Sequence, residues 1–198
     1  YGGWVLYTDE GSTGVIMENN LVYGCKSGAF HQHYGRENII KNNIFAFGQY
    51  FQVQLTKVEE HCSFTFSNNI ILGDCGVMFA GPWDKANIDM KKNLYWDLRT
   101  DNPDFLDMKF KEWKKKRDKQ SVLTDPLFIN PQKGDFRFKS MKHARKINFI
   151  PFDYTQAGVY GPKEWKEKAK MSENDIKRFS TIIKEREKSY SSYYGSSK

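Results

Sequence analysis

Eleven residues in the first half of the chain carry the carboxylate, imidazole, guanidinium and aromatic groups that acid–base chemistry on a polymer requires. They are Asp9, Glu10, His31, His33, Tyr34, Arg36, Glu59, Glu60, His61, Trp83 and Asp84. Hydrolysis of a glycosidic bond needs two carboxyl groups, one acting as acid and the other as base or nucleophile. We therefore predict Asp9 and Glu60 as catalytic residues and the other nine as substrate-binding residues.

Simpler interpretations of these residues stay open. Asp9 and Glu10 precede a glycine and fit an ordinary polar turn, while residues 59–61 fit either a solvated loop or a paired Glu–His general acid. His31 and His33 would lie about 7 Å apart on one strand face, where two imidazoles can hold a metal. A third ligand is not evident, whereas neutral imidazole can bind a substrate hydroxyl or shuttle a proton. No metal and no cofactor are predicted.

A repeated pair of asparagines indicates the elements that position these side chains. Asn-Asn followed by three mostly apolar residues occurs at residues 19–23, 42–46 and 68–72, and a weaker Lys-Asn version occurs at 92–96. The second residues of the pairs, 20, 43, 69 and 93, are separated by 23, 26 and 24 positions. Such a period is typical of a solenoid, and regularly spaced leucines of a leucine-rich repeat are missing.

Each repeat reads as three short strands with no room for a helix, which is one turn of a three-sided coil. In the second repeat the sides are predicted at residues 29–33, 38–41 and 44–46, with a turn at 34–36 and a bend at Asn42-Asn43. Asn tolerates left-handed backbone angles and can form stacked hydrogen-bonded ladders. Stacking would align the polar turns in one cleft, with Asp9 and Glu60 two coils or about 9.6 Å apart, near the spacing of inverting enzymes.

The predicted fold is therefore all-β: a right-handed parallel β-helix of about four coils, from Trp4 to Trp96. Residues 105–119 are expected to form a short covering helix, and strands near 125–128 and 134–138 an irregular C-terminal cap. The solenoid domain is assigned to residues 1–162 and a basic helical tail to 163–198, disordered from Ser189. A helix starting at Ser172-x-x-Asp175 could cover the C-terminal end of the solenoid.

Charge and cysteine usage narrow the choice of function. The net charge of +7 arises from residues 107–119 and 163–198, which contribute +4 each and leave −1 for the rest of the chain. A nucleic-acid groove along the solenoid is therefore not expected. No apolar run approaches the roughly 20 residues of a membrane span. Cys25 and Cys75 would lie two coils apart, too far for a disulfide, so free thiols are expected.

Three segments resemble a known class of proteins. Residues 7–14 (YTDEGSTG), 30–38 (FHQHYGREN) and 42–46 (NNIFA) resemble right-handed parallel β-helix proteins of bacterial polysaccharide degradation, closest to glycoside hydrolases of the fucosidase and xylanase type. Residues 125–128 and 134–136 match the C-terminal pattern of the same proteins, so the resemblance covers residues 1–161.

The resemblance implies a cleft along the helix, Asp9 as a catalytic carboxylate, and a polysaccharide or oligosaccharide as the partner. It also implies an extracellular or periplasmic location and further coils before Tyr1, which could supply the second carboxylate. Two alternatives remain on the same fold. One is a polysaccharide lyase with Arg36 or a lysine as base, and the other is a carbohydrate-binding β-helix without catalysis.

Overall fold

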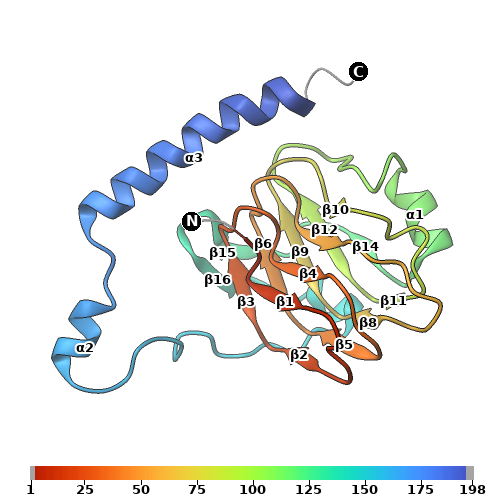
Figure 1. Cartoon of the computed structure of the whole chain (residues 1–198), viewed down its shortest axis with the longest axis horizontal. Coiled ribbons are helices and arrows are strands. Elements are labelled where there is room, and N and C mark those ends of the chain that lie inside the picture. Colours follow the sequence, from red (N-terminus) through yellow and green to blue (C-terminus); the bar gives the residue numbers. More distant parts are fainter. Residues whose placement is uncertain (1–2, 195–198) are drawn as a thin grey trace. The chain divides into compact units, whose positions relative to one another are not determined.

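The computed structural model describes residues 3–194, and parallel strands stack there into three sheets (Figure 1). The first sheet contains β1 (Leu6–Thr8), β4 (Phe30–Gln32), β7 (Val53–Leu55) and β10 (Phe79–Ala80). The second contains β2 (Ile16–Glu18), β5 (Asn38–Lys41), β8 (Phe64–Ser67), β11 (Asp89–Lys91) and β13 (Asp118–Lys119). The third contains β3 (Leu21–Tyr23), β6 (Ile44–Ala46), β9 (Ile70–Gly73), β12 (Leu94–Asp97) and β14 (Val122–Leu123). The parallel β-helix is confirmed, and its right-handed sense stays a prediction.

The asparagine pairs form the corner between the second and third sheets. The first residue of each pair has a left-handed backbone, with φ of 58° at Asn19, 53° at Asn42, 58° at Asn68 and 54° at Lys92. The carbonyl oxygen of each following Asn side chain accepts a hydrogen bond from the backbone N–H one coil earlier. These bonds, all 3.0 Å long, join Asn20 to Asn43, Asn43 to Asn69 and Asn69 to Asn93. The predicted asparagine ladder is thereby confirmed.

A fifth coil follows the four that were predicted. Gln120 has the left-handed backbone of the corner, with φ of 64°, and the Ser121 hydroxyl accepts the bond from the backbone N–H of Asn93 at 2.7 Å. β13 and β14 then extend the second and third sheets. The repeat therefore does not stop at Trp96. It continues with Gln-Ser in place of Asn-Asn and with a helix inserted before the second side.

That helix, α1 (Phe110–Lys116), lies within the residues 105–119 predicted as a short covering helix, and it packs on the core. Trp113 on α1 is fully buried, and its ring centroid lies 4.7 Å from that of Phe79 and 6.2 Å from that of Phe105. The solvent-facing lysines of the helix keep the exposed surface polar. Phe110 of the same helix also packs on Tyr95 and Phe105, with ring centroids 6.1 and 5.4 Å apart, so aromatic side chains of α1 cover the apolar end of the core.

The segment after the fifth coil packs along the side of the solenoid. β15 (Phe128–Asn130), the short 3₁₀ turn η1 (Pro131–Lys133) and β16 (Asp135–Phe138) form an antiparallel hairpin that lies beside β3 in Figure 1. Phe136 reaches Tyr23 of the first coil, with ring centroids 5.1 Å apart. The predicted cap strands exist, but they cover the third sheet because its outer face is apolar.

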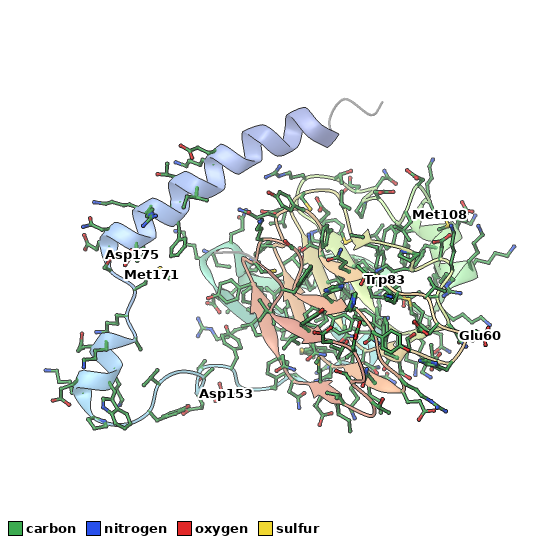
Figure 2. All side chains as sticks on the ribbon, viewed as in Figure 1. Glu60, Trp83, Met108, Asp153, Met171 and Asp175 are labelled. Atoms are coloured by element: carbon green, nitrogen blue, oxygen red, sulfur yellow. The ribbon has the colours of Figure 1, made fainter. Side chains whose placement is uncertain are left out.

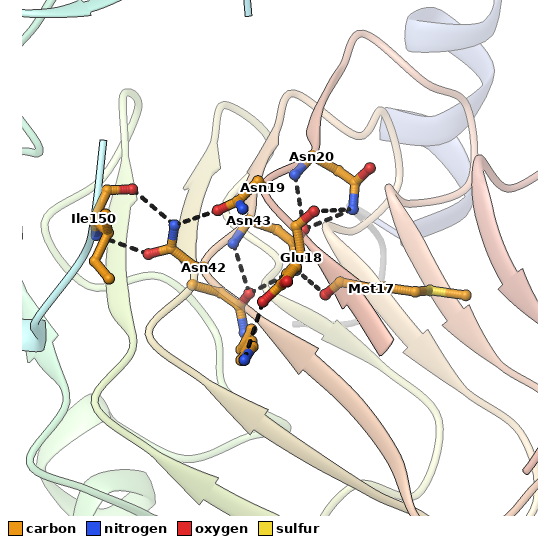
Figure 3. Close-up of polar contacts among 9 residues, drawn as sticks. Met17, Glu18, Asn19, Asn20, Asn42, Asn43 and Ile150 are labelled. Carbon is orange, nitrogen blue, oxygen red and sulfur yellow. Dashed lines mark hydrogen bonds and ion pairs between the residues drawn. The ribbon is translucent and has the colours of Figure 1, made fainter. Parts of the chain in front are cut away.

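Asparagines of the corner also hold the chain that follows the hairpin. Asn42 donates to the Ile150 carbonyl at 2.7 Å and accepts from the Ile150 N–H at 2.8 Å, as Figure 3 shows. Asn68 donates to the carbonyl of Ile147, at the end of the 3₁₀ turn η2 (Ala144–Ile147), at 2.6 Å. First-position asparagines therefore both turn the chain and fasten the C-terminal segment of the solenoid.

The second compact unit begins at Asp153, whereas we predicted the solenoid domain to end at residue 162. Residues 155–162 are exposed, and the boundary at 162 stays a prediction. The unit contains α2 (Lys163–Lys168) and α3 (Glu173–Tyr194). The Ser172 hydroxyl accepts from the Asp175 N–H at 3.1 Å, so the predicted helix start is confirmed. α3 continues beyond Ser189 to Tyr194; residues 195–198, the end of the tail expected to be disordered, lie outside the described residues.

Candidate functional site

The outer face of the first sheet gathers the polar residues that the sequence analysis singled out. Side chains alternate along each strand, so Leu6, Phe30, Val53 and Phe79 point into the core. The next position faces outward, and the strand register aligns Tyr7 with His31, His31 with Gln54 and Gln54 with Ala80. Two positions further along, Asp9, His33 and Thr56 continue the outward face. Together with Trp4, the residues Tyr7, Asp9, His31, His33, Gln54 and Thr56 form what we term the outer-face cluster.

Four rings of the cluster are in contact. Tyr7 stacks on His31, with ring centroids 4.9 Å apart and planes inclined by 22°. Trp4 lies 5.3 Å from Tyr7 and 4.2 Å from His31, and His33 lies 6.0 Å from His31. Trp4 and Tyr7 keep 40% and 39% of their surface exposed, so both aromatic residues remain partly accessible to solvent.

Hydrogen bonds fix the orientation of these rings. The Trp4 indole donates to the Gln54 side chain at 2.5 Å. The Thr56 hydroxyl lies 3.0 Å from Nε2 of His31 and 2.9 Å from Nδ1 of His33. A hydroxyl has one hydrogen, so Thr56 can donate to only one of the two imidazole nitrogens and accepts from the other when that nitrogen carries a proton. The two histidines are therefore coupled through one hydroxyl group.

Asp9 is the carboxylate of the cluster. Its pKa lies below the ordinary value because the backbone N–H of Glu10 and the Tyr7 hydroxyl, 3.0 Å away, donate to the charged form. His33 and His31 lower the pKa further, and Tyr7 in turn has a raised pKa through desolvation and the bond to Asp9. Asp9 is thus ionised at neutral pH, which suits a base or nucleophile and does not suit a general acid.

His31 is neutral over the same pH range. Burial, with only 2% of the residue exposed, is the main reason that its pKa falls to about 4, and His33 lowers it further. Nε2 is bonded to Thr56, but Nδ1 is buried and has no hydrogen-bond partner among the described residues. A neutral ring of this kind contributes stacking surface and hydrogen bonding, and it adds no positive charge to the site.

The structure brings Asp9, His31 and His33 together and places most other predicted site residues elsewhere. Glu10 is exposed next to Asp9. Glu59 and Glu60 lie in the loop between β7 and β8, and Figure 2 shows Glu60 at the outer edge of the solenoid. Glu60 is not among the groups that shift the pKa of Asp9. The catalytic pairing of Asp9 with Glu60 stays a prediction.

The remaining predicted residues serve other contacts or face solvent. His61 lies 3.1 Å from the Gly35 carbonyl and so ties its loop to the preceding coil. Arg36 pairs with Glu37 at 3.2 Å, Tyr34 is half-buried beside it in the chain, and Asp84 is exposed.

Trp83 is a core residue, so its prediction as a substrate-binding residue was wrong. None of its surface is exposed, and its ring centroid lies 4.9 Å from that of Phe79 and 5.5 Å from that of Phe64. The indole donates to the Ala80 carbonyl at 3.1 Å, which satisfies its N–H inside the core. Burial of a large aromatic ring in the core stabilises the fold more than exposure of the same ring on a turn would.

Sequence reasoning missed four members of the cluster: Trp4, Tyr7, Gln54 and Thr56. The alternation that puts His31 on the outer face also puts Tyr7 and Gln54 there, so the signal was present in the aligned first sides. Thr56 and Trp4 lie just outside the strands, where alignment of the repeats does not predict which way a side chain points.

Other kinds of site find little support in the part of the chain that the structure describes. No three His, Cys, Asp or Glu residues between positions 3 and 194 converge as a metal ion requires. Cys25, Cys62 and Cys75 are free, and burial raises the pKa of Cys25 and of Cys75 to about 11, which makes both poor nucleophiles. Among the described helices, none has the length and apolar character that crossing a bilayer requires.

Comparisons of the chain with models of protein families, with curated proteins and with solved structures find no match.

Proposed function

We propose that the outer-face cluster binds a neutral polysaccharide and that the chain is a glycoside hydrolase, or the C-terminal part of one, with Asp9 as a catalytic carboxylate. The observation that carries this proposal is the stack of Trp4 and Tyr7 on the buried His31, with the first two rings partly exposed and an ionised carboxylate beside them. Aromatic rings offer broad apolar faces to the C–H groups of a sugar ring, while nearby polar groups bind its hydroxyls. An extracellular or periplasmic location belongs to the same proposal.

The charge of the cluster favours a neutral polymer. Asp9 is ionised, His31 is uncharged, and the cluster contains neither lysine nor arginine. A uronic acid polymer would bring its carboxylate towards Asp9 without a cation to compensate, which is unfavourable. Arg36, the base considered for a lyase, is engaged with Glu37. These contacts support hydrolysis of a neutral glycan over elimination from a uronide.

The second catalytic group is the part of the proposal that lies outside the cluster. A lowered pKa makes Asp9 the base or nucleophile, so a separate acid must protonate the leaving group. β1 lies at the edge of the first sheet. A strand paired with that edge would place outward side chains about 4.8 Å from Tyr7. We place the acid on such a strand, consistent with the further coils that the sequence analysis expected before Tyr1.

The test separates binding from cleavage. The chain is mixed with insoluble neutral glycans, such as xylan and cellulose, and with a polyuronide, and the bound fraction and released reducing sugar are measured. We expect retention on a neutral glycan, weakened about tenfold or more by Trp4→Ala. Trp165→Ala is the matched control, because Trp165 is exposed and lies in the C-terminal unit.

Cleavage is tested on the longest natural form of the chain. Asp9→Asn should abolish sugar release while leaving retention on the glycan intact, because the amide keeps the shape and removes the charge. If the chain is retained on a glycan but releases no sugar from any glycan, the hydrolase proposal is rejected and a carbohydrate-binding role is supported. Release of an ultraviolet-absorbing unsaturated uronide would show a lyase, and equal retention of Trp4→Ala and wild type would remove the cluster as the binding site.

A further inference from the structure

A recess lies on the third sheet, away from the outer-face cluster. It has a volume of about 190 Å³ and opens between the end of β12 and the hairpin β15–β16. We propose that this recess, termed the Trp96 pocket, binds a single neutral pyranose ring of a glycan. The inference does not depend on the proposed hydrolase, because the two sites share no residue and lie on different sheets.

The floor of the Trp96 pocket is apolar and partly aromatic. Tyr95 points into the core, so Trp96 faces outward, where the register pairs it with Leu72 of the preceding coil. Leu72 is buried and Trp96 is half-buried, so the indole is held in place yet offers one surface to the recess. Pro126 adds a rigid ring to the lining. Flat apolar surfaces of this kind pack against the C–H face of a pyranose.

The rim of the pocket is polar and unoccupied by protein contacts. Asn130, Gln132 and Lys139 line the recess with exposed side chains. Within residues 3–194, none of these three side chains has a hydrogen bond or ion pair. Asn and Gln amides donate and accept, and the lysine ammonium only donates. Hydroxyl groups also donate and accept, so a ring carrying several of them can satisfy this rim.

The walls of the pocket are preformed by backbone bonds. The Thr124 N–H donates to the Tyr95 carbonyl at 3.0 Å, and the Lys139 N–H donates to the Leu127 carbonyl at 2.8 Å. Asp125 accepts from the Leu127 N–H at 2.7 Å, which fixes the turn at the pocket edge. Because the walls are already ordered, the site loses less conformational entropy when it binds a ligand.

Size and charge select the ligand class. Pockets for drug-sized molecules usually span roughly 300–1,000 Å³, so a recess of about 190 Å³ fits one ring and not a chain segment. Asp125 and Lys139 carry opposite charges at the same recess, and neither sign dominates. A neutral sugar unit fits this balance better than a phosphate or a uronate.

The experiment is a titration of the ¹⁵N-labelled chain with methyl glycosides of glucose, galactose and xylose, followed by amide and indole shifts. Methyl glucuronide and the open-chain polyol sorbitol serve as ligand controls. We expect at least one neutral pyranoside to shift the Trp96 indole and the Gln132 side-chain signals saturably, and both ligand controls to have weaker effects.

Variants connect the shifts to the pocket. Trp96→Ala should abolish the saturable shifts, and Gln132→Ala should weaken binding about threefold to tenfold, as loss of one hydrogen bond does. Gln132 is exposed, so that variant keeps the test decisive if Trp96→Ala does not fold. Trp4→Ala should leave this binding unchanged. Absence of saturable shifts with every pyranoside, equal responses to sorbitol, or unchanged affinity in Gln132→Ala would overturn the proposal.

Discussion

The asparagine corner and the outer-face cluster are built by the same stacking of coils, yet they treat polar groups in opposite ways. At the corner, Asn43 accepts from one neighbouring coil and donates to Asn69 at 3.0 Å and to the Met17 carbonyl at 2.9 Å. In the cluster, the buried Nδ1 of His31 has no partner among the described residues, and two aromatic rings remain exposed. Stacking alone therefore does not distinguish a structural row from a functional one.

What distinguishes the two rows is whether the protein itself satisfies the side chains. A buried amide that bonds only to its own chain stabilises the coil and has nothing left for a ligand. Exposed rings and an unpaired imidazole nitrogen cost stability unless something else covers them. The loss of a side chain should therefore cost most stability at the corner.

Asn69→Ala should destabilise the protein most. The Asn69 side chain accepts from the N–H and the amide of Asn43, both at 3.0 Å, and donates to the Ile40 carbonyl at 2.9 Å. Its loss leaves buried donors unpaired, so we expect the free energy of unfolding to fall by on the order of 4 kcal/mol. Urea unfolding measures the change.

Asn20→Ala is the matched control, because Asn20 occupies the same position in the first coil but is only half-buried. It should cost about 1 kcal/mol. Equal losses in the two variants would show that the ladder does not act through buried hydrogen bonds.

The second prediction concerns two buried titratable groups with opposite effects. Asp118 ends the ladder and accepts from Tyr95, Ser121 and Asn93 at 2.6, 2.5 and 3.1 Å. Burial nevertheless raises its pKa to about 6, whereas the pKa of His31 falls to about 4. For Asp118 the folded state binds more protons than the unfolded state, so stability decreases as pH rises from about 4 to 6. For His31 the folded state binds fewer protons, so stability increases between about pH 4 and 6.5.

The two contributions oppose each other in wild type, and single substitutions should separate them. Asp118→Asn should leave a stability that increases with pH across this window. His31→Gln should leave a stability that decreases by up to about 3 kcal/mol, which corresponds to the Asp118 shift. Urea unfolding at pH 4, 5, 6 and 7 checks both slopes, and parallel pH profiles for the two variants would contradict the assignment.

The contrast between corner and cluster also explains what the sequence could reveal. The corner was predictable because one residue type both bends the chain and bonds to its copy in the next coil, so its spacing is visible. Gln120 and Ser121 form the same corner with different side chains, so the repeat is not visible there and the fifth coil was missed. The position of the hairpin depends on contacts between segments far apart in sequence, such as those of Phe136 with Tyr23 and Phe47, which no local pattern reveals.

The candidate site was predictable only in part. His31 and His33 were placed correctly by alternation on one strand, and Asp9 by alignment of the turns. Trp83 was not, because it lies in a loop whose length differs from coil to coil, and the role predicted for the exposed Glu60 stays a prediction. In such loops burial and packing decide where each side chain points. Trp83 is buried in the core, whereas Glu60 is exposed to solvent.

The smallest expected effect lies within the cluster itself. Tyr7→Phe keeps the ring that stacks on His31 and removes only the hydroxyl that donates to Asp9 at 3.0 Å. Because that bond stabilises the carboxylate, its loss should raise the pKa of Asp9 towards the ordinary value, which ¹³C NMR titration of the carboxyl carbon measures. Tyr34→Phe is the control, since Tyr34 is not among the groups that shift this pKa.

If Asp9 is the catalytic base, the acidic limb of kcat/KM moves to higher pH in Tyr7→Phe alone. If the pKa of Asp9 rises but the acidic limb does not shift, the hydrogen bond from Tyr7 exists and Asp9 is not the catalytic base. The Tyr7→Phe variant therefore tests the structure of the cluster and its proposed function separately.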